Sequence, residues 1–352
     1  MKKEVRISFH ACIIVTLVST LMGCVNNNSS LYTNIQEPLA ISTEMDELRF
    51  LAEQSDKYSQ FSLALIYLNY ENSAKAEYWF TRAGEQGHTI AQYNLGMMYF
   101  NGFMVAPNYD QALYWFKKAA EQGHIPAQDS LGIVYRDIAN DYNQSVYWFR
   151  KAAEQGDASA QLNLGMAYYL GRGVVQNHKQ MVYWTRAAAE QGLGVAQYNL
   201  GTMYEGGNGV TQDYEQAVYW YKRASEHGNM MAQHNLGSMY LTGRGITQSY
   251  EDAAYWYREA AEQGDVFAQV SLGLLYGHGL GVAQSFEQSV YWLRVAAEQE
   301  HAMAQNNLGV MYRDGLGVAQ SYEQAAHWFK QATEQGEPLG EINLSTLPVQ
   351  YR

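Results

Sequence analysis

Residues 232–240 read AQHNLGSMY, and this stretch decides the fold because close variants of it return at a fixed interval along the chain. Ala232, Leu236 and Met239 are spaced i, i+4 and i+7, which places one apolar stripe along an α-helix. The glycine-rich segment 243–246 then ends the helix, since glycine tolerates the positive φ of a helix terminus. The stretch therefore predicts the first helix of a repeated unit.

A second helix follows in the same unit. It begins at Ser249, carries Ala253 and Trp256 on one face, and ends at Gly264. Ser249 with Asp252 resembles a capping box, in which the serine hydroxyl accepts a hydrogen bond from the first turn of the helix. The same arrangement recurs in two later units, as Ser285 with Gln288 and Ser321 with Gln324.

Two ladders of residues fix the period of the unit. All eight tryptophans occupy one position, 36 residues apart with a single interval of 33: Trp79, Trp115, Trp148, Trp184, Trp220, Trp256, Trp292 and Trp328. Glycines from Gly96 to Gly309 follow the same intervals. A fixed period in this range is typical of a solenoid. The sequence thus predicts an all-α solenoid, with about eight helix-turn-helix repeats over residues 45–336 and a C-terminal cap over 337–352.

The composition narrows the classes of partner. The chain has 352 residues, of which 47% are hydrophobic and 16% charged, and its formal net charge is −12. Loss of residues 1–23 would remove Lys2, Lys3, Arg6 and Glu4, a net +2, and leave a mature charge of −14. Such a surface repels nucleic acid, so we expect no nucleic-acid partner.

Residues 1–23 have the layout of an export signal. Basic residues precede an apolar run from 7 to 21, which is short of the roughly 20 residues that a membrane-spanning helix needs. The run ends in LMGC at 21–24, which resembles the lipobox of bacterial lipoproteins and implies that Cys24 is acylated. The alternative is an ordinary secretory leader with an accidental cysteine.

Residues 24–44 are expected to form a flexible tether, because they open with the polar stretch VNNNSS at 25–30. Val25 stands where lipoproteins of the inner membrane usually carry Asp, so the resemblance implies sorting to the outer membrane. We therefore expect a lipoprotein of the bacterial cell envelope, held in the outer membrane through lipidated Cys24 and facing the periplasm.

The repeated unit resembles the Sel1-like repeat, a relative of the tetratricopeptide repeat. The resemblance rests on Ala-Gln-x-Asn-Leu-Gly-x-x-Tyr, then Gly-x-Gly-Val, Ala-x-Tyr-Trp and Ala-Ala-Glu-Gln-Gly, from about residue 59 to 336. The period of 36 and the glycine loop distinguish it from the 34-residue tetratricopeptide unit. The resemblance implies a right-handed superhelix of α-hairpins that serves as a protein-interaction scaffold.

No catalytic constellation is visible in the sequence. It contains no HExxH, no phosphate-binding P-loop, no GxSxG and no penicillin-recognising serine motif. We expect no enzyme, no metal site and no cofactor. Two alternatives remain open: an envelope hydrolase of the β-lactamase-like kind claimed for cysteine-rich relatives, whose cysteines this chain lacks, and a binder of cell-wall glycan, suggested by its tyrosines and asparagines.

A partner-binding stripe is predicted on the first helices. Residues that vary between units lie at i, i+4 and i+7, as Leu162, Met166 and Tyr169 do in one unit. The polar or aromatic ones include Tyr93, Phe100, Tyr169, Tyr198 and His234. Beside them runs a nearly constant amide: Asn94, Asn163, Asn199, Asn235 and Asn307. An amide both donates and accepts, so it can hold the backbone of a protein segment or extended peptide in a concave groove. Alternatively, the varying residues are unselected solvent positions and the amides join helices to one another.

Overall fold

The computed structural model describes residues 38–70, 72–103 and 105–352, and for residues 38–44 the backbone alone. It divides into an N-terminal unit that ends at Lys151 and a C-terminal unit, Ala152–Arg352, and each is described by itself. The predicted signal peptide 1–23, Cys24 and the first part of the predicted tether lie outside the described residues.

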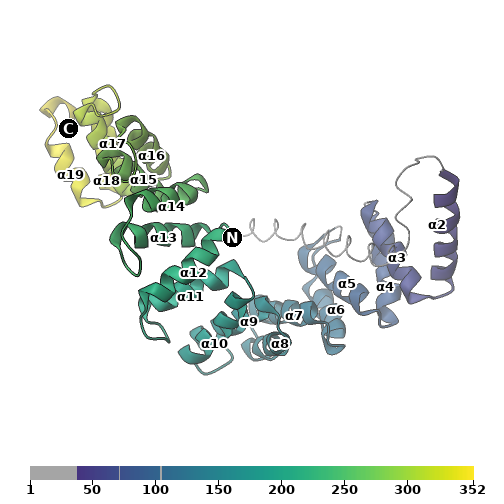
Figure 1. The fold of residues 1–352 in the computed structure, drawn as a ribbon. Helices are drawn as coiled ribbons and strands as arrows, with labels where there is room; N and C mark the ends of the chain where they lie inside the picture. The colour runs from purple at the N-terminus through teal and green to yellow at the C-terminus, as the bar shows by residue number, and fades with distance from the viewer. Residues whose placement is uncertain (1–37, 71, 104) are drawn as a thin grey trace. The chain divides into compact units, whose positions relative to one another are not determined.

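The N-terminal unit holds helices α2 to α7 and most of α8 (Figure 1). Their bounds are Pro38–Glu53 (α2), Lys57–Asn69 (α3), Ser73–Glu85 (α4), Thr89–Asn101 (α5), Tyr109–Glu121 (α6), Ile125–Asp137 (α7) and Tyr142–Glu154 (α8). Helix α2 begins inside the segment that the sequence assigned to the tether. Proline suits the first turn of a helix, because the N–H that it lacks would have no partner within the helix.

The C-terminal unit holds α9 to α19 and a short 3₁₀ helix. The bounds are Ala158–Leu170 (α9), His178–Glu190 (α10), Gly194–Gly206 (α11), Tyr214–Glu226 (α12), Met230–Thr242 (α13), Tyr250–Glu262 (α14), Val266–His278 (α15), Phe286–Glu298 (α16), Ala302–Asp314 (α17), Tyr322–Glu334 (α18), Pro338–Ser345 (α19) and Val349–Tyr351 (η1).

The helices pack as successive pairs. The odd-numbered helices from α3 to α17 are the first helices of the repeats, and the even-numbered ones from α4 to α18 are the second helices. Inside each unit, the two helices of a repeat pack together, as α5 does with α6 and α9 with α10. Second helices also pack on the first helix of the following repeat, as α4 does on α5, α10 on α11 and α12 on α13. No β-strand occurs among the described residues. These contacts confirm the predicted all-α solenoid.

The ends of the helices follow from capping residues. The predicted pairs are confirmed: Ser249 Oγ accepts a hydrogen bond from the Asp252 N–H at 3.1 Å, and Ser285 and Ser321 act in the same way. Three first helices begin instead with histidines whose Nδ1 accepts from a backbone N–H at 3.1–3.3 Å. These histidine caps are His88, His124 and His301. Burial lowers the pKa of all three below the ordinary 6.5, which favours the neutral ring that can accept.

The tryptophan ladder belongs to the core, as predicted. Trp79, Trp115, Trp148, Trp220 and Trp292 are buried, and the other three are half-buried. Each buried ring joins apolar residues of neighbouring helices; Trp220 of α12 packs in the cluster of Met181, Ala188 and Leu200 from α10 and α11. The tryptophans therefore couple one repeat to the next, which is the arrangement expected in a solenoid.

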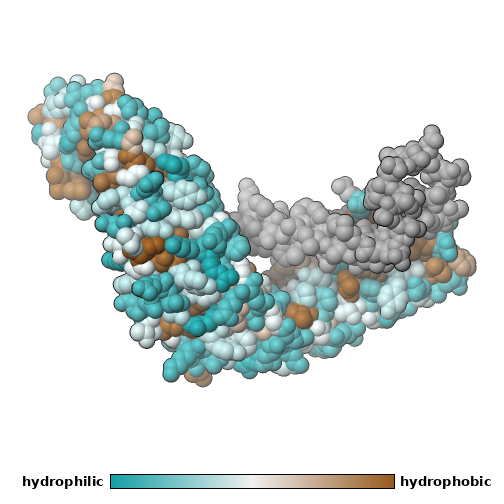
Figure 2. All heavy atoms as spheres, viewed as in Figure 1, coloured by the Kyte–Doolittle hydropathy of each residue, from teal (hydrophilic) through white to brown (hydrophobic). Residues whose placement is uncertain are grey.

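The surface around this core is mostly polar. Figure 2 shows apolar side chains in small separate groups on a largely hydrophilic face.

At the C-terminal end, α19 packs on α18, and Leu347 is 1% exposed beside Phe329. None of the helices in the described part of the chain is long and apolar enough to cross a membrane.

Candidate partner-binding surface on the first helices

The predicted partner-binding residues lie on first helices and are reachable from solvent to different degrees. Tyr169 is 45% exposed. The others are half-buried: Tyr93, Asn94, Phe100, Asn163, Tyr198, Asn199, His234, Asn235 and Asn307. They divide between α5 in the N-terminal unit and α9, α11, α13 and α17 in the C-terminal unit, so no single cluster brings all of them together.

A pocket of about 220 Å³ lies between α9, α10 and α11. Its apolar lining comes from Leu162, Met166 and Tyr169 of α9, Met181 of α10 and Met203 of α11. The three residues from α9 are the varying positions i, i+4 and i+7 of that helix. Three residues that the sequence analysis assigned to the partner-binding stripe therefore line a pocket in the structure.

The polar part of this pocket comes mainly from α11 and the loop after it. Asn199, Thr202 and Asn208 contribute amides and a hydroxyl, and Thr185 contributes a hydroxyl from α10. The Thr202 hydroxyl donates to the Asn199 carbonyl at 2.7 Å, so part of this rim is held in place. Of the predicted site residues, Tyr169 and Asn199 line the pocket together.

A network of tyrosines lies below the surface next to this pocket and joins α11, α12 and α13. The Tyr221 hydroxyl donates to Glu205 Oε2 at 2.6 Å, and Asn235 hydrogen-bonds to Tyr221 and Tyr198. Burial, reinforced by the Glu205 carboxylate, raises the pKa of Tyr221 far above its ordinary value, so the phenol stays protonated. Asn235 therefore has the helix-joining role that the sequence left open as an alternative.

His234 belongs to a second polar group, around Asp265. His234 Nδ1 lies 3.1 Å from Asp265 Oδ1, and its ring packs edge-on against Tyr257 and Phe267. Burial raises the pKa of Asp265, but the hydrogen bonds from His234 and from the Ala268 N–H outweigh it, so the net shift is downward. His234 thus ties α13 to the cap of α15.

A ladder of glutamines joins the repeats, and the sequence reasoning did not find it. Buried glutamines of the first helices donate Nε2 to a carbonyl near the end of the preceding second helix; Gln92 does so to Gly84 at 2.7 Å. Their Oε1 atoms accept from glutamines that follow the next second helix, at 2.6–2.8 Å. The pairs are Gln60 with Gln86, Gln92 with Gln122, Gln161 with Gln191, Gln233 with Gln263, Gln269 with Gln299 and Gln305 with Gln335.

The ladder is interrupted at α11. Gln197 is fully buried, and its Oε1 has no hydrogen-bond partner, because His227 stands where the other repeats supply a glutamine. The same helix begins at Leu193, which gives no side-chain cap, whereas the N-caps of the first helices from α3 to α9 and from α13 to α17 all do. Helix α11 therefore lacks both the side-chain N-cap and the glutamine hydrogen bond that hold the corresponding helices of other repeats. This helix forms one wall of the pocket.

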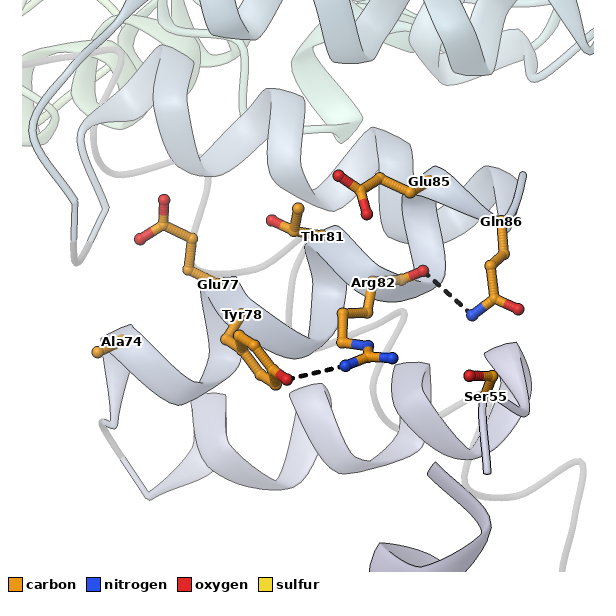
Figure 3. Close-up of a pocket in the computed structure, with 8 residues that line it drawn as sticks. All are labelled: Ser55, Ala74, Glu77, Tyr78, Thr81, Arg82, Glu85 and Gln86. Atoms are coloured by element: carbon orange, nitrogen blue, oxygen red, sulfur yellow. Dashed lines mark hydrogen bonds between the residues drawn. The ribbon is translucent and has the colours of Figure 1, made fainter. Parts of the chain in front are cut away.

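A second hollow lies on second helix α4, beside Ser55 (Figure 3). Arg82 donates to the Tyr78 hydroxyl at 3.0 Å, while Glu77, Thr81 and Glu85 form an adjacent row on the helix. Glu77 accepts a hydrogen bond from Tyr99, and burial together with this carboxylate raises the pKa of Tyr99 to about 12.

No group of histidine, cysteine or acidic residues in the described ranges is arranged to hold a metal ion. The predicted lipidation site, Cys24, lies outside these ranges.

The comparisons with known proteins agree on the family. The family model described as Sel1 repeat matches residues 58–88, 89–124, 127–157, 158–193, 194–229, 231–265, 266–301 and 302–337. The search of curated proteins found no match.

Two solved structures are similar over most of the chain. One is c5321, described as a protective antigen of uropathogenic Escherichia coli strains with an SLR fold, at 37% identity and a TM-score of 0.81; the match covers 85% of this chain but 66% of that one, so this chain spans only part of its length. The other is a Sel1 repeat protein from Oxalobacter formigenes, at 31% identity and a TM-score of 0.69, with 92% and 98% of the two chains covered. The chain therefore belongs to the Sel1 repeat family.

Proposed function

We propose that this protein is an envelope-anchored scaffold that binds an extended segment of a protein partner along its first helices. Sel1 repeat proteins are generally protein-interaction scaffolds, which supports the class of function. One observation carries the choice of surface. The varying residues Leu162, Met166 and Tyr169, found from sequence alone, line a pocket beside Asn199, one of the nearly constant amides.

The chemistry of this surface suits a peptide. Aromatic and methionine side chains provide apolar contact, and methionine adapts to differently shaped partners. The neighbouring amide can donate to a peptide carbonyl and accept from a peptide N–H, which holds a backbone without reading its sequence. Binding is therefore expected to depend on a few anchor side chains of the partner rather than on a long exact match.

Anchoring is proposed from the sequence. The leader over 1–23 and the LMGC stretch support lipidation of Cys24, and Val25 supports sorting to the outer membrane with the solenoid in the periplasm. Lipidation of one cysteine attaches several acyl chains in bacterial lipoproteins, and more than one chain is what stable anchoring requires. The likeness to a protein described as a protective antigen is compatible with an envelope location.

A paired substitution tests the proposed surface. Met166 on α9 is 42% exposed and Tyr183 on α10 is 61% exposed, so a glutamate at either position should be tolerated by the fold. Affinity capture from envelope extract, followed by mass spectrometry, would compare the two variants with the wild-type chain. We expect Met166→Glu to lose the proteins that wild type and Tyr183→Glu both retain. Equal retention by both variants would show that the first-helix surface is not the binding surface.

A glycan-binding surface is the second candidate, and one observation favours it. The second helices expose a tyrosine at one repeated position, about half of each ring being accessible: Tyr78, Tyr114, Tyr147, Tyr183, Tyr219, Tyr255 and Tyr291. Aromatic rings of this kind can stack on sugars. However, each packs edge-on against the following tryptophan. Basic side chains also lie over the faces of four of these rings: Arg82, Lys118, Lys151 and Arg223. Sedimentation with purified peptidoglycan decides this candidate, since the peptide-binding scaffold should stay in solution.

A further inference from the structure

One position of the second helices, the residue that follows each tryptophan, fills the space opposite a small residue of the first helix, which is Ala64 in α3 and glycine in the later first helices. In seven repeats this residue is large and buried: Phe80, Phe116, Phe149, Tyr221, Tyr257, Leu293 and Phe329. In α10 it is Thr185. The change removes most of an aromatic ring from a packed core, and such a loss leaves a cavity unless neighbouring side chains move in.

The repeat of α5 and α6 shows what the filled space looks like. A Cβ on Gly96 would lie 2.4 Å from Phe116 Cδ1, so the glycine makes room for the ring. Tyr93 and Phe100 surround the same ring, with centroid distances of 5.9 and 6.3 Å, and Met97 packs in the same cluster. The space opposite the glycine thus holds one phenyl ring among three first-helix side chains.

The corresponding residues in α9 surround no ring. Leu162, Met166 and Tyr169 stand 69 residues after Tyr93, Met97 and Phe100, which is one period of 36 and one of 33, and Thr185 stands 69 after Phe116. These four residues line the 220 Å³ pocket. The pocket therefore lies where six other repeats place an aromatic side chain and one places Leu293.

The chain compensates for the missing ring only in part. Met181 is 3% exposed and occupies a position that is alanine or serine in the other repeats, as in Ala112 and Ala217. A methionine there fills some of the space, but it is flexible and can be displaced. The remaining volume exceeds the roughly 150 Å³ of an apolar cavity that admits benzene.

We propose that this pocket is an anchor socket for one phenylalanine side chain of a bound partner peptide, which replaces in trans the ring that Thr185 no longer supplies. The inference rests on the proposed peptide-binding function and specifies that the partner peptide carries a phenylalanine. None of the nine lining residues, all of them in the described part of the chain, carries a charge, so an uncharged ring is favoured over a charged group. Asn199 and Asn208 also line the socket, and we expect their amides to bind the peptide backbone beside the phenylalanine.

The lining itself provides the reporters for a test. Met166, Met181 and Met203 are in the socket, whereas Met239 and Met311 are buried in other repeats. The full chain, labelled with ¹³C at the methionine methyl groups, would be titrated with N-acetyl-phenylalaninamide and, as a control, N-acetyl-aspartamide. We expect saturable shifts of the three socket methyls with the phenylalanine probe, at a dissociation constant of about 1 mM for a ligand of about fifteen non-hydrogen atoms. Met239 and Met311 should not move, and the aspartate probe should have no effect.

A large side chain at position 185 should fill the socket and prevent the phenylalanine probe from binding. Thr185→Phe introduces the residue that four other repeats carry at this position, and we expect it to weaken binding of the phenylalanine probe at least ten-fold while Thr185→Val does not. If Met181 obstructs the new ring and the variant misfolds, Thr185→Phe with Met181→Ala reproduces the pair Ala112 and Phe116 and answers the same question. Unaltered binding by a folded, filled variant, or no saturable shift in the wild-type chain, would overturn the socket. Protein capture lost in Met166→Glu but kept in the filled variant would overturn it while leaving the proposed scaffold function intact.

Discussion

The gap in the glutamine ladder at α11 predicts a stabilising substitution. In six repeats a glutamine after the second helix donates to the buried Oε1 of a first-helix glutamine, at 2.6–2.8 Å. Gln197 Oε1 is buried without such a donor, because residue 227 is histidine. We expect His227→Gln to supply the donor and to raise the free energy of unfolding of the C-terminal unit.

The size of the effect follows from three contributions. A buried acceptor left without a partner costs about 1–3 kcal/mol, and the new hydrogen bond removes that cost. Ordering a glutamine side chain on the surface costs up to about 1.5–2 kcal/mol, and only part of this applies, since residue 227 already follows a helix. The expected net gain is about 1 kcal/mol. For a unit of this size that corresponds to a rise in Tm of about 2–4 °C.

Thermal and urea unfolding of the same protein would measure the gain, and the chain offers matched controls. Gln263→His makes the opposite change at an intact rung, beside Gln233, and should lower stability by about 1 kcal/mol. His227→Ala removes the histidine without adding a donor and should give no gain. If His227→Gln is neutral while Gln263→His destabilises, the Gln197 carboxamide oxygen is already satisfied by water, and the reasoning from an unpaired acceptor is wrong.

Four further predictions concern the caps, the core, the amides and the anchor. The histidine caps have pKa values below 6.5 because they are buried, so their stabilisation should be complete above pH 6.5 and be lost as pH falls through the lowered pKa values; His124→Asn should weaken that dependence in pH-dependent melting curves. Trp220→Ala should cost about 3–5 kcal/mol and loosen α10 and α11, which limited proteolysis would detect; unaltered melting would contradict its core assignment. Asn235→Ala should lower Tm because Tyr221 and Tyr198 lose a hydrogen bond, whereas Asn199→Ala should leave Tm within about 1 °C and weaken partner binding; the reverse pattern in paired melting and binding assays would exchange their roles. Cys24→Ser should release the protein from the membrane fraction of the producing cell, and unchanged fractionation without lipid on the mature N-terminus would exclude the anchor.

The fold could be predicted because the same pattern of core residues occurs in eight repeats of the sequence. The tryptophan ladder indicated the period, apolar residues at helical spacing indicated the two helices, and the serine pairs marked where second helices begin. Each of these signals is local to one unit, where helical spacing alone determines which residues share a face. This is why Ser249, Gly243 and Trp220 all occupy the expected places.

The links between units were harder to predict. The glutamine pairs join residues about 30 positions apart, and their contact depends on how one repeat stacks on the next. Asn235 looked equivalent to Asn199, but Tyr221 stands near it where most other repeats carry phenylalanine or leucine, and the phenol binds the amide. The socket had a visible sequence signal, the lone threonine at 185, but only the structure shows that Met181 leaves it open.

Site-specific photocrosslinking in the producing cell tests the central claim, that partners bind the first helices, most directly. Benzoylphenylalanine would be placed at Tyr169 on α9, which is 45% exposed, and separately at Tyr291 on α16, which is 54% exposed. The account predicts a discrete protein adduct from position 169 that Met166→Glu abolishes, and none from position 291. Adducts of equal yield from both positions, or an adduct from 291 alone, would contradict it.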